Sequence, residues 1–286
     1  MSLLLSVGHV TWDRVEGRDI LGGSASYAAL TAKKLGWDAA VLTAASPDFV
    51  PERDMPGISV AVRPSKSTTR FMNKYDAAGN RQQFMLSRAD DVDVALAPET
   101  WRAPQALLLA SVSAEIPPRT ARAFDAGVVG VIAQGWLRHF AADGEVSPRP
   151  WPEPAADLEG VHVLFLSIHD VGGEVAKARE MLDLVPMVAL TRGWHGMDLM
   201  TRDAVHSVPT LPRKEVDPTG AGDVFAAGFV LRYAECNDPL EAAAFASCTA
   251  SCAVEGVGTS TLGDRAEVEK RLAQREKLIE DGEWDE

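Results

Sequence analysis

The residues best suited to chemistry in this chain lie between Val216 and Phe229. Gly220, Ala221 and Gly222 leave the backbone uncovered just before a run that is apolar on every side, which is typical of a buried helix. The first amides of a helix have no partner inside it and carry the positive end of its dipole, so they suit a phosphate or a developing oxyanion. Asp223 follows in the first turn. The stretch therefore predicts an anion hole with a carboxylate beside it.

Pro218 determines how the chain enters this helix. A proline disfavours helical backbone at the residue before it, so we expect Asp217 to be extended and the turn to lie at Thr219 to Gly222. A carboxylate beside phosphate-binding amides can take a proton from an incoming hydroxyl, which is the general-base role in phosphoryl transfer. The helix dipole alone also favours an Asp such as Asp223 in a first turn, which leaves a purely structural role open.

The run from Asp217 to Asp223, Asp-Pro-Thr-Gly-Ala-Gly-Asp, resembles the C-terminal signature of the ribokinase-like (PfkB) family of sugar and nucleoside kinases. The resemblance implies that Asp223 is the catalytic base and that the amides of Gly220, Ala221 and Gly222 form the anion hole. It also implies an α/β fold, a ribokinase-like three-layer α/β/α sandwich with a mostly parallel central sheet and a short β lid. The expected activity is transfer of the γ-phosphoryl group of ATP to a hydroxyl, with Mg²⁺ bridging the phosphates.

The N-terminal part resembles the same family. Asp13 follows a predicted strand, and Gly22 and Gly23 directly precede a predicted helix. In the family, an Asp and a Gly-Gly pair at these places hold sugar hydroxyls, so the resemblance implies that these three residues bind the substrate. Tyr27 stands where the family often has Asn, and we include it among the substrate-binding candidates.

A second glycine-containing loop, residues 191–196, follows another predicted strand. It resembles the family's Thr-x-Gly-x-x-Gly loop, which lies along the nucleotide, and glycines there let backbone approach a phosphate closely. The nucleotide-binding residues implied by the resemblance are Thr191, Arg192, Gly193, Gly196, Thr219 and Gly258.

Two acidic residues are candidates for cation binding. Asp170 lies where the family usually has Asn-x-x-Glu, which is linked to magnesium through water. It can still hold a hydrated ion, because Mg²⁺ normally keeps several waters, although an Asp capping the following helix is the alternative. In relatives, carbonyls near the residue matching Asp217 can hold a monovalent cation, which makes K⁺ a further candidate.

Gln134 and Arg138 suggest a subgroup. Their spacing is similar to the Gln-x-x-x-Arg of the inositol kinase branch, which implies that Gln134 binds a polyol hydroxyl and Arg138 a phosphate. Myo-inositol is then the favoured acceptor among small sugars and cyclitols. A nucleoside or ketose kinase of the same family is the alternative. A catalytically silent sugar- or nucleotide-binding regulatory protein is the alternative of another class, because the magnesium motif is altered and the lid is short.

Composition and missing motifs exclude other classes. The 286 residues carry a net charge of −13, which would repel a phosphate backbone, so we expect no nucleic-acid partner. No Gly-x-Gly-x-x-Gly follows the first predicted strand and no Gly-Lys pair occurs, which argues against a dinucleotide-dependent dehydrogenase and a P-loop enzyme. No apolar run reaches membrane-spanning length. We expect a cytoplasmic monomer or homodimer that binds a small polyol or sugar and ATP.

The predicted elements alternate along the chain as in a parallel sheet covered on both faces. We expect one domain over residues 1–286, with lid or edge strands from about 11–21 and 57–86. The predicted strands are Leu3 to Val7, Ala39 to Thr43, Ile58 to Val62, Thr68 to Tyr75, Arg81 to Leu86, Ala106 to Ala110, Val128 to Ala133, Val161 to Leu166 and Met187 to Leu190. The predicted helices are Ser24 to Leu35, Pro118 to Ala126, Val175 to Leu184, Val224 to Tyr233, Leu240 to Val254 and Asp264 to Glu280.

Overall fold

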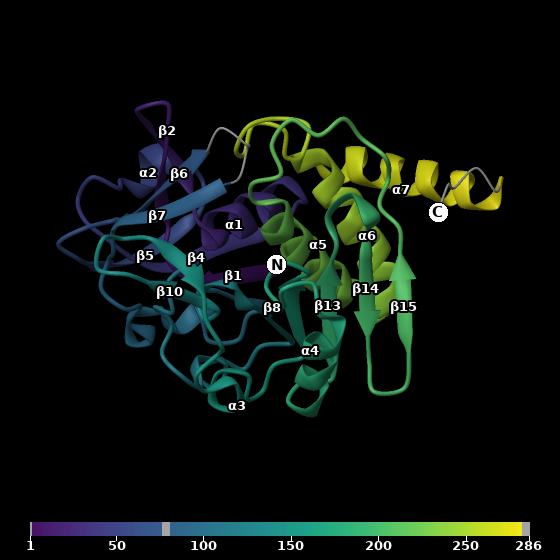
Figure 1. Cartoon of the computed structure of the whole chain (residues 1–286), viewed down its shortest axis with the longest axis horizontal. Helices are drawn as coiled ribbons and strands as arrows, with labels where there is room; N and C mark the ends of the chain where they lie inside the picture. Colours follow the sequence, from purple (N-terminus) through teal and green to yellow (C-terminus); the bar gives the residue numbers. More distant parts are fainter. Residues whose placement is uncertain (1, 76–80, 282–286) are drawn as a thin grey trace.

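The computed structural model describes residues 2–75 and 81–281. Its largest sheet is built from strands β1 (Leu3–Val7), β4 (Asp38–Ala45), β5 (Ser59–Pro64), β8 (Ala106–Ala110), β9 (Val128–Ile132), β12 (Val163–Ser167), β13 (Met187–Thr191), β14 (Met197–Met200) and β15 (Val205–Val208). Their order is β15-β14-β13-β12-β9-β8-β1-β4-β5 (Figure 1). Every neighbouring pair from β13 to β5 is parallel. The strands β14 and β15, which sequence analysis missed, add an antiparallel edge.

The central strands are buried on both faces, as their continuous apolar runs predict. In β1, Leu4 packs into the apolar cluster on one side of the sheet, and Leu5 and Val7 pack into the cluster on the other side. This alternation follows from the two-residue period of a strand. Helices must therefore cover both faces.

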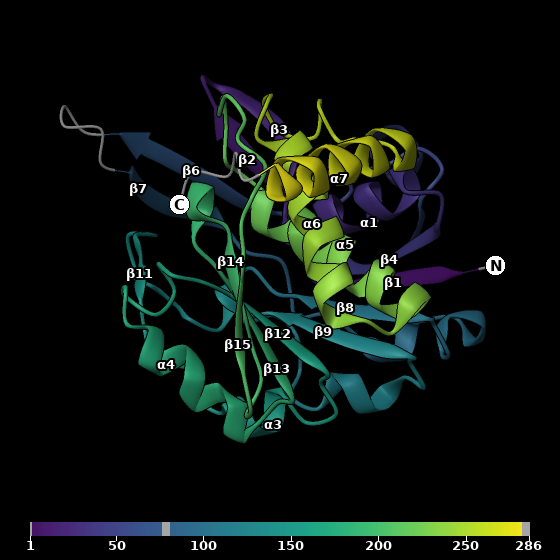
Figure 2. The ribbon, with the colours of Figure 1, turned by 90° about the vertical axis from the view of Figure 1, so that its right-hand side faces the viewer.

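Two helical layers flank the sheet (Figure 2). One layer contains α1 (Ser24–Lys34), α5 (Ala221–Cys236), α6 (Pro239–Ala253) and α7 (Arg265–Glu280), whereas α3 (Pro154–Asp157) and α4 (Val175–Glu180) lie on the opposite side. The remaining short helices are α2 (Pro51–Asp54) and the 3₁₀ helices η1 (Val94–Leu96), η2 (Glu99–Trp101), η3 (Thr120–Ala123), η4 (Ala133–Gly135), η5 (Met181–Asp183) and η6 (Gly193–His195). The three-layer α/β fold predicted from the sequence is confirmed.

The second helical layer is thinner than predicted. The helix expected at Pro118 to Ala126 is wrong as an α-helix, because only the 3₁₀ helix η3 forms there. Arg119, directly before it, has a left-handed backbone with φ 59°, which a continuous helix does not allow. The helix expected at Val175 to Leu184 ends at Glu180 and continues only as η5.

A second sheet forms the lid. Its strands are β2 (Thr11–Val15), β3 (Arg18–Gly22), β6 (Thr69–Tyr75) and β7 (Arg81–Ser87), in the order β3-β2-β6-β7. Of the strands predicted between residues 57 and 86, β5 joins the edge of the central sheet and the other two join the lid. The segment between the predicted strands at Thr68 to Tyr75 and Arg81 to Leu86, where the sequence Asp-Ala-Ala-Gly-Asn is typical of a turn, lies outside the described residues. Sequence analysis missed a further hairpin, β10 (Arg138–Phe140) with β11 (Val146–Pro148).

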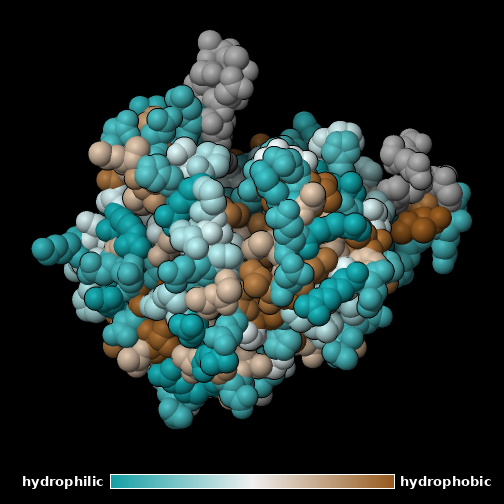
Figure 3. Space-filling view, turned by 60° about the horizontal axis from the view of Figure 1, so that its bottom comes forward, coloured by the Kyte–Doolittle hydropathy of each residue, from teal (hydrophilic) through white to brown (hydrophobic). Residues whose placement is uncertain are grey.

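The strand order reverses direction beside β1. The chain first adds β4 and β5 on one side of β1, then returns to add β8, β9, β12 and β13 on the other. Ligands of such sheets bind outside the carboxyl ends of the strands near a reversal of this kind. The described residues contain no helix that is long and apolar enough to span a bilayer. On the face shown in Figure 3, hydrophobic side chains gather near the middle of a largely hydrophilic surface.

Candidate active site

A cavity of about 2150 Å³ lies where the lid, the carboxyl ends of the central strands and the start of α5 meet. Most of the residues singled out from the sequence line it: Asp13, Gly23, Tyr27, Gln134, Arg138, Asp170, Thr191, Arg192, Gly193, Gly196, Thr219, Gly220, Ala221, Gly222 and Asp223. Gly22, Asp217 and Gly258 are not among its lining residues. The topology thus brings into one cavity segments that are far apart in the sequence.

The start of α5 has the geometry of an anion site. Gly220 is the N-cap, with a left-handed backbone at φ 80°. A Cβ on this glycine would collide with the ring of Tyr27, so both backbone conformation and space require glycine. The first helical hydrogen bond runs from the Val224 amide to the Gly220 carbonyl at 2.9 Å, and the Ala221 amide donates to the Pro218 carbonyl at 3.2 Å. Among the described residues, the amides of Gly222 and Asp223 have no backbone carbonyl partner, and both residues line the cavity.

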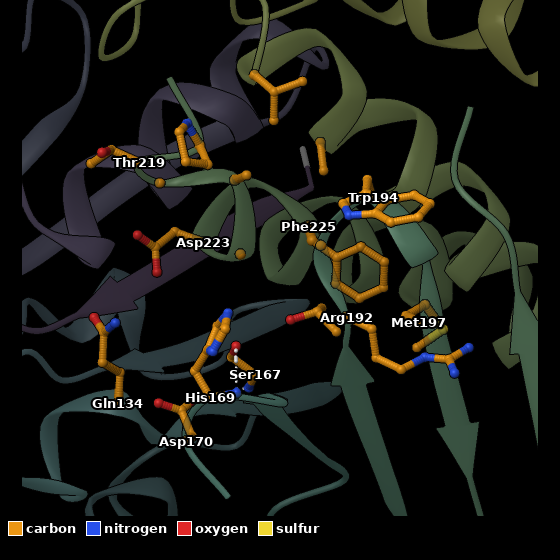
Figure 4. A pocket seen from close by; sticks show the side chains of 18 of the residues that line it. Gln134, Ser167, His169, Asp170, Arg192, Trp194, Met197, Thr219, Asp223 and Phe225 are labelled. Carbon is orange, nitrogen blue, oxygen red and sulfur yellow. Dashed lines mark hydrogen bonds between the residues drawn. The ribbon is translucent and has the colours of Figure 1, made fainter. Parts of the chain in front are cut away.

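Asp223 lies half-buried in the first turn of α5 and points into the space that Gln134, His169 and Asp170 also face (Figure 4). Burial raises the pKa of the Asp223 carboxyl to about 6, and the negative charges of Asp13 and Asp170 act in the same direction. A hydrogen bond from Ser24 and the positive charge of Arg138 oppose this rise. A carboxylate with a pKa near neutrality is suited to accept a proton and release it again.

The lid supplies a second carboxylate through Asp13 on β2. Its Oδ1 accepts a hydrogen bond from the Thr11 hydroxyl at 3.0 Å. A Cβ on Gly22 would collide with the carboxylate of Asp13, so this glycine makes room for the carboxylate without lining the cavity. Gly23 has φ 90°, and a Cβ there would lie 2.5 Å from the His9 carbonyl oxygen. The Gly-Gly pair is therefore required by packing at the junction of lid and core.

Asp170 and Arg138 lie on the opposite wall. The Asp170 Oδ2 accepts a hydrogen bond from the Ser167 amide at 2.7 Å, which closes the turn after β12. Asp170 therefore caps this turn and does not cap α4. Burial raises the pKa of the Asp170 carboxyl, whereas the charges of Arg138 and His169 oppose the rise. Arg138 donates to the Val112 carbonyl at 3.4 Å, and its guanidinium lies 5.8 Å from the centre of the Phe71 ring.

The loop after β13 forms the far side of the cavity. The Arg192 amide donates to the Gly196 carbonyl at 2.7 Å, and Gly196 has φ 85°, so the loop is a tight turn. The guanidinium of Arg192 pairs with Asp198 at 3.0 Å. Any phosphate that contacts Arg192 would share it with this carboxylate. Trp194, Phe225 and Met197 lie together at this end (Figure 4).

The turn before α5 is held by Asp217. Its Oδ1 accepts a hydrogen bond from the Thr219 amide at 2.9 Å, and its own amide donates to the Val254 carbonyl at 3.2 Å. The extended entry expected from Pro218 is thus tied to the loop after α6. Gly258, in that loop, has φ 61°. A Cβ added to this glycine would lie 3.9 Å from the Tyr27 hydroxyl.

Part of the chain is similar to a known family. Residues 151–265 match the pfkB family of carbohydrate kinases. This match covers 115 of the 286 residues and includes the run from Asp217 to Asp223. The nucleoside kinase of Methanothermobacter thermautotrophicus is 39% identical over 87 residues, which make up 30% of this chain and 28% of that protein. The bifunctional protein HldE of Pelobacter propionicus is 35% identical over 100 residues, 34% of this chain and 20% of that protein. The chain thus spans less than a third of the length of these two curated relatives.

Solved structures resemble this chain over nearly its whole length. A pyrophosphate-dependent kinase in the ribokinase family, complexed with a pyrophosphate analog and myo-inositol, matches with a TM-score of 0.79 and 19% identity, over 93% of this chain and 99% of that one. Ribokinase from Thermotoga maritima matches with a TM-score of 0.73 and 22% identity, over 96% of this chain and 100% of that one. The ribokinase fold predicted from the sequence is confirmed.

The donor set of the cavity fits a hydrated magnesium ion. The Asp170 carboxylate lines the cavity, and a cation beside it would favour its charged form. No group of three or more His, Cys, Asp or Glu residues within 2–75 and 81–281 could hold a metal directly. A magnesium ion would therefore need water and donor phosphates for most of its ligands, which is the usual arrangement for Mg²⁺.

Several cavity residues escaped sequence analysis. Ser24 bonds to Asp223, and the Gln83 amide donates to the Asn73 Oδ1 at 3.2 Å on adjacent lid strands. Glu145 enters the cavity from the unpredicted β10–β11 hairpin. Asn73 of β6 lines the cavity, whereas Arg70 on the same strand does not. Arg70 instead pairs with Asp19 and Asp48 outside the cavity, because alternate residues of a strand face opposite sides.

Proposed function

We propose that this protein is an ATP-dependent kinase that transfers the γ-phosphoryl group to a hydroxyl of a small sugar or cyclitol. The observation that carries the proposal is the placement of Asp223 beside the exposed amides at the start of α5, inside the cavity that also contains Asp13. An anion hole, a general base and hydroxyl-binding groups in one cavity are the parts that phosphoryl transfer needs. The pfkB family match supports the reaction class.

In this mechanism the acceptor hydroxyl lies against Asp223, which takes its proton as the phosphoryl group arrives. The amides of Gly220 and Gly222 face the charge that develops on the transferred group and stabilise it without reorganising. The Ala221 amide, which donates to the Pro218 carbonyl at 3.2 Å, would have to share its hydrogen with that group. Arg138, whose charge acts on both Asp223 and Asp170, adds a positive charge to the wall between them. When bound, Mg²⁺ would neutralise the donor phosphates, with Asp170 holding it through water.

Asp13 and Gln134 are proposed to hold the acceptor from the lid and from the sheet. Myo-inositol is the favoured acceptor because the Gln134 and Arg138 pair resembles the inositol kinase branch and both side chains line the cavity. A structural neighbour binds myo-inositol, whereas a relative with 39% identity over 87 residues is a nucleoside kinase. A nucleoside acceptor is therefore the second candidate.

The donor is proposed to bind along the loop after β13, with its base toward Phe225. The residues at this end include Phe225, Met197, Leu211, Ala250 and Val254, which form the apolar part of the wall. Apolar walls suit a nucleobase, which a pyrophosphate donor lacks. Potassium beside Asp217 is proposed as an additional cofactor, because the adjoining loops offer carbonyl oxygens.

The test is an acceptor panel with the purified protein. ADP release would be measured with Mg-ATP and myo-inositol, ribose, fructose, adenosine or cytidine, with and without potassium, and pyrophosphate would replace ATP in a parallel series. We expect one cyclitol or sugar to respond strongly and only with ATP. Binding of ATP and a polyol without any turnover would contradict the proposal and favour a silent regulatory protein.

A further inference from the structure

The charges that line the cavity are divided between its two ends. Asp13 and Glu145 lie at the end formed by the lid and the β10–β11 hairpin, and Asp170 and Asp223 lie between the two ends. The arginines Arg192, Arg213 and Arg275 lie at the other end, in the loop after β13, the loop before α5 and helix α7. They outnumber the carboxylate of Glu215, which also lines the cavity from the loop before α5. In Figure 1, α7 lies to the right of α5, and the lid strands β2, β6 and β7 lie to its left.

Among the described residues that line the cavity, Arg138 is the one arginine at the acidic end, and it is already engaged. Arg138 donates to the Val112 carbonyl, lies over the Phe71 ring, and acts on the carboxylates of Asp170 and Asp223. A phosphate or carboxylate on the acceptor would have to compete with these partners. It would also approach the carboxylates of Asp13 and Glu145, and like charges brought together at an interface oppose binding strongly.

The β10–β11 hairpin holds Glu145 against the edge of the lid. The Met85 amide of β7 donates to the Gly144 carbonyl at 2.8 Å, and Phe84 and Glu145 form an antiparallel bridge. Gly144 has φ 88°, and a Cβ there would lie 2.5 Å from the Met85 carbonyl oxygen, so this contact needs glycine. Glu145 therefore has a fixed backbone position beside the lid strand that carries Gln83.

The polar groups around Glu145 suit hydroxyls. Asn73 and Gln83 form an amide pair on the lid, and Gln134 offers a third amide from the opposite wall. Amides donate and accept, while carboxylates accept from a hydroxyl. A ring of such groups can bind several hydroxyls of one polyol and gives no compensating charge to an anionic substituent.

We propose that the acceptor is an uncharged polyol and that Glu145 is a specificity-determining residue that excludes sugar phosphates and sugar acids. This inference rests on the proposed kinase function. The carboxylate of Glu145 accepts a hydrogen bond from an acceptor hydroxyl, and it repels an acceptor that carries its own phosphate or carboxylate. The basic end of the cavity is left for the donor, whose phosphates are negatively charged.

The test compares neutral acceptors with their charged counterparts: myo-inositol with myo-inositol 1-phosphate, fructose with fructose 6-phosphate, and glucose with glucuronate. Phosphoryl transfer gives kcat/KM for each, and calorimetry without donor measures binding of the same compounds independently of turnover. The variant is Glu145→Gln, with Glu99→Gln as the control, since Glu99 is exposed in η2 and does not line the cavity.

The wild type should favour the neutral member of the responding pair by about 100-fold or more, and Glu145→Gln should reduce this ratio by about tenfold, the scale expected for removing one nearby like charge. Glu99→Gln should leave the ratio unchanged. Transfer to a charged acceptor as efficient as to its neutral counterpart would overturn the inference while leaving the kinase assignment intact. Selective binding of neutral polyols without transfer would support the inference and contradict the kinase assignment. An unchanged ratio of neutral to charged acceptor in Glu145→Gln would contradict the proposed role of Glu145 in specificity.

Discussion

Asp223 combines two properties that a general base in phosphoryl transfer needs. It lies in the first helical turn, where the dipole stabilises negative charge, yet burial and two neighbouring carboxylates raise its pKa to about 6. A base with a much lower pKa would accept a proton poorly, and one with a much higher pKa would be protonated at neutral pH. Arg138 and Ser24 keep the rise moderate.

The pH dependence follows from this pKa. Because Asp223 must be ionised to accept a proton, kcat/KM should be level above about pH 7 and fall by about tenfold per pH unit well below the pKa of about 6. Initial rates between pH 5 and 8.5 at subsaturating acceptor would show this. A profile that stays flat down to pH 5 would contradict the role of Asp223.

The raised pKa of Asp223 also predicts how the stability of the fold changes with pH. The native pKa of Asp223 lies above its usual value of 3.8, so folding favours the protonated form and the stability this gives is lost as the pH rises through the native pKa. Asp223→Asn removes the penalty for an ionised carboxylate. Its Tm should exceed that of the wild type at pH 8, and the difference should shrink toward pH 4.5. A lower Tm at pH 8 would contradict this account of the burial.

Gly220 and Gly222 should respond differently to alanine. Gly220→Ala forces a left-handed backbone on alanine and drives a Cβ into Tyr27, so both Tm and activity should fall. Gly222 is helical and a Cβ there meets nothing within 4 Å. Alanine has a higher helix propensity than glycine, so Gly222→Ala should leave the free energy of unfolding unchanged or raise it by about 0.5–1 kcal/mol, and Tm should not fall. Its methyl group would enter the anion site and weaken donor binding. Equal thermal stability of the two variants would contradict the glycine requirement at Gly220.

At the scale of elements, a buried histidine joins the lid to the core. His9 lies between β1 and β2, its Nδ1 is 2.8 Å from the Thr69 hydroxyl at the start of β6, and its Nε2 is 2.9 Å from the Asp90 carbonyl after β7. The Thr69 hydroxyl oxygen also accepts from the Ala89 amide at 2.9 Å. Glu115 accepts from the His9 amide at 2.9 Å. Two contacts to the lid segments, with Thr69 and Asp90, therefore meet at one imidazole, and the backbone amide of His9 adds a contact with Glu115.

Thr69→Val tests whether this junction positions the lid. The change keeps the shape of the side chain but removes the hydrogen bonds to His9 and Ala89, so the KM of the acceptor should rise by several-fold while the KM of the donor stays nearly constant. Thr43→Val is the matched control, because Thr43 is equally buried and accepts one amide bond from Val10. Each variant should lose about 1–3 kcal/mol of stability from an unpaired buried group. An acceptor KM that rises equally in both variants would contradict a specific role for the junction.

For the whole molecule, the sequence predicted the fold and much of the candidate site because two kinds of local pattern are strong here. Continuous apolar runs predicted the buried parallel strands. The glycines before Asp223 predicted where α5 starts, which is beside the carboxyl ends of the central strands. Sequence analysis missed the edge strands β14 and β15 and the β10–β11 hairpin. Strands of three or four residues are too short for a two-residue alternation of apolar and polar residues to be recognised.

The cavity residues that sequence analysis did not identify depend on contacts between segments that are distant in the sequence. Nothing local marks Glu145 as a cavity residue, because it enters the cavity only through the docking of its hairpin on β7. Arg70 and Asn73 lie on one strand and differ only in the face on which they project, which the polar sequence around them does not reveal. The roles of the cavity residues in binding and catalysis stay predictions.

The most direct measurement follows the transferred phosphoryl group itself. The wild type and Asp223→Asn would be incubated with Mg-ATP and a neutral polyol, and ³¹P NMR would follow ADP, phosphate monoester and free phosphate, with ATP binding to both proteins checked by calorimetry. We expect one monoester per ADP with the wild type and a rate about 10²- to 10⁴-fold lower in Asp223→Asn, with ATP still bound. Monoester formation at a nearly unchanged rate in Asp223→Asn would contradict the central claim.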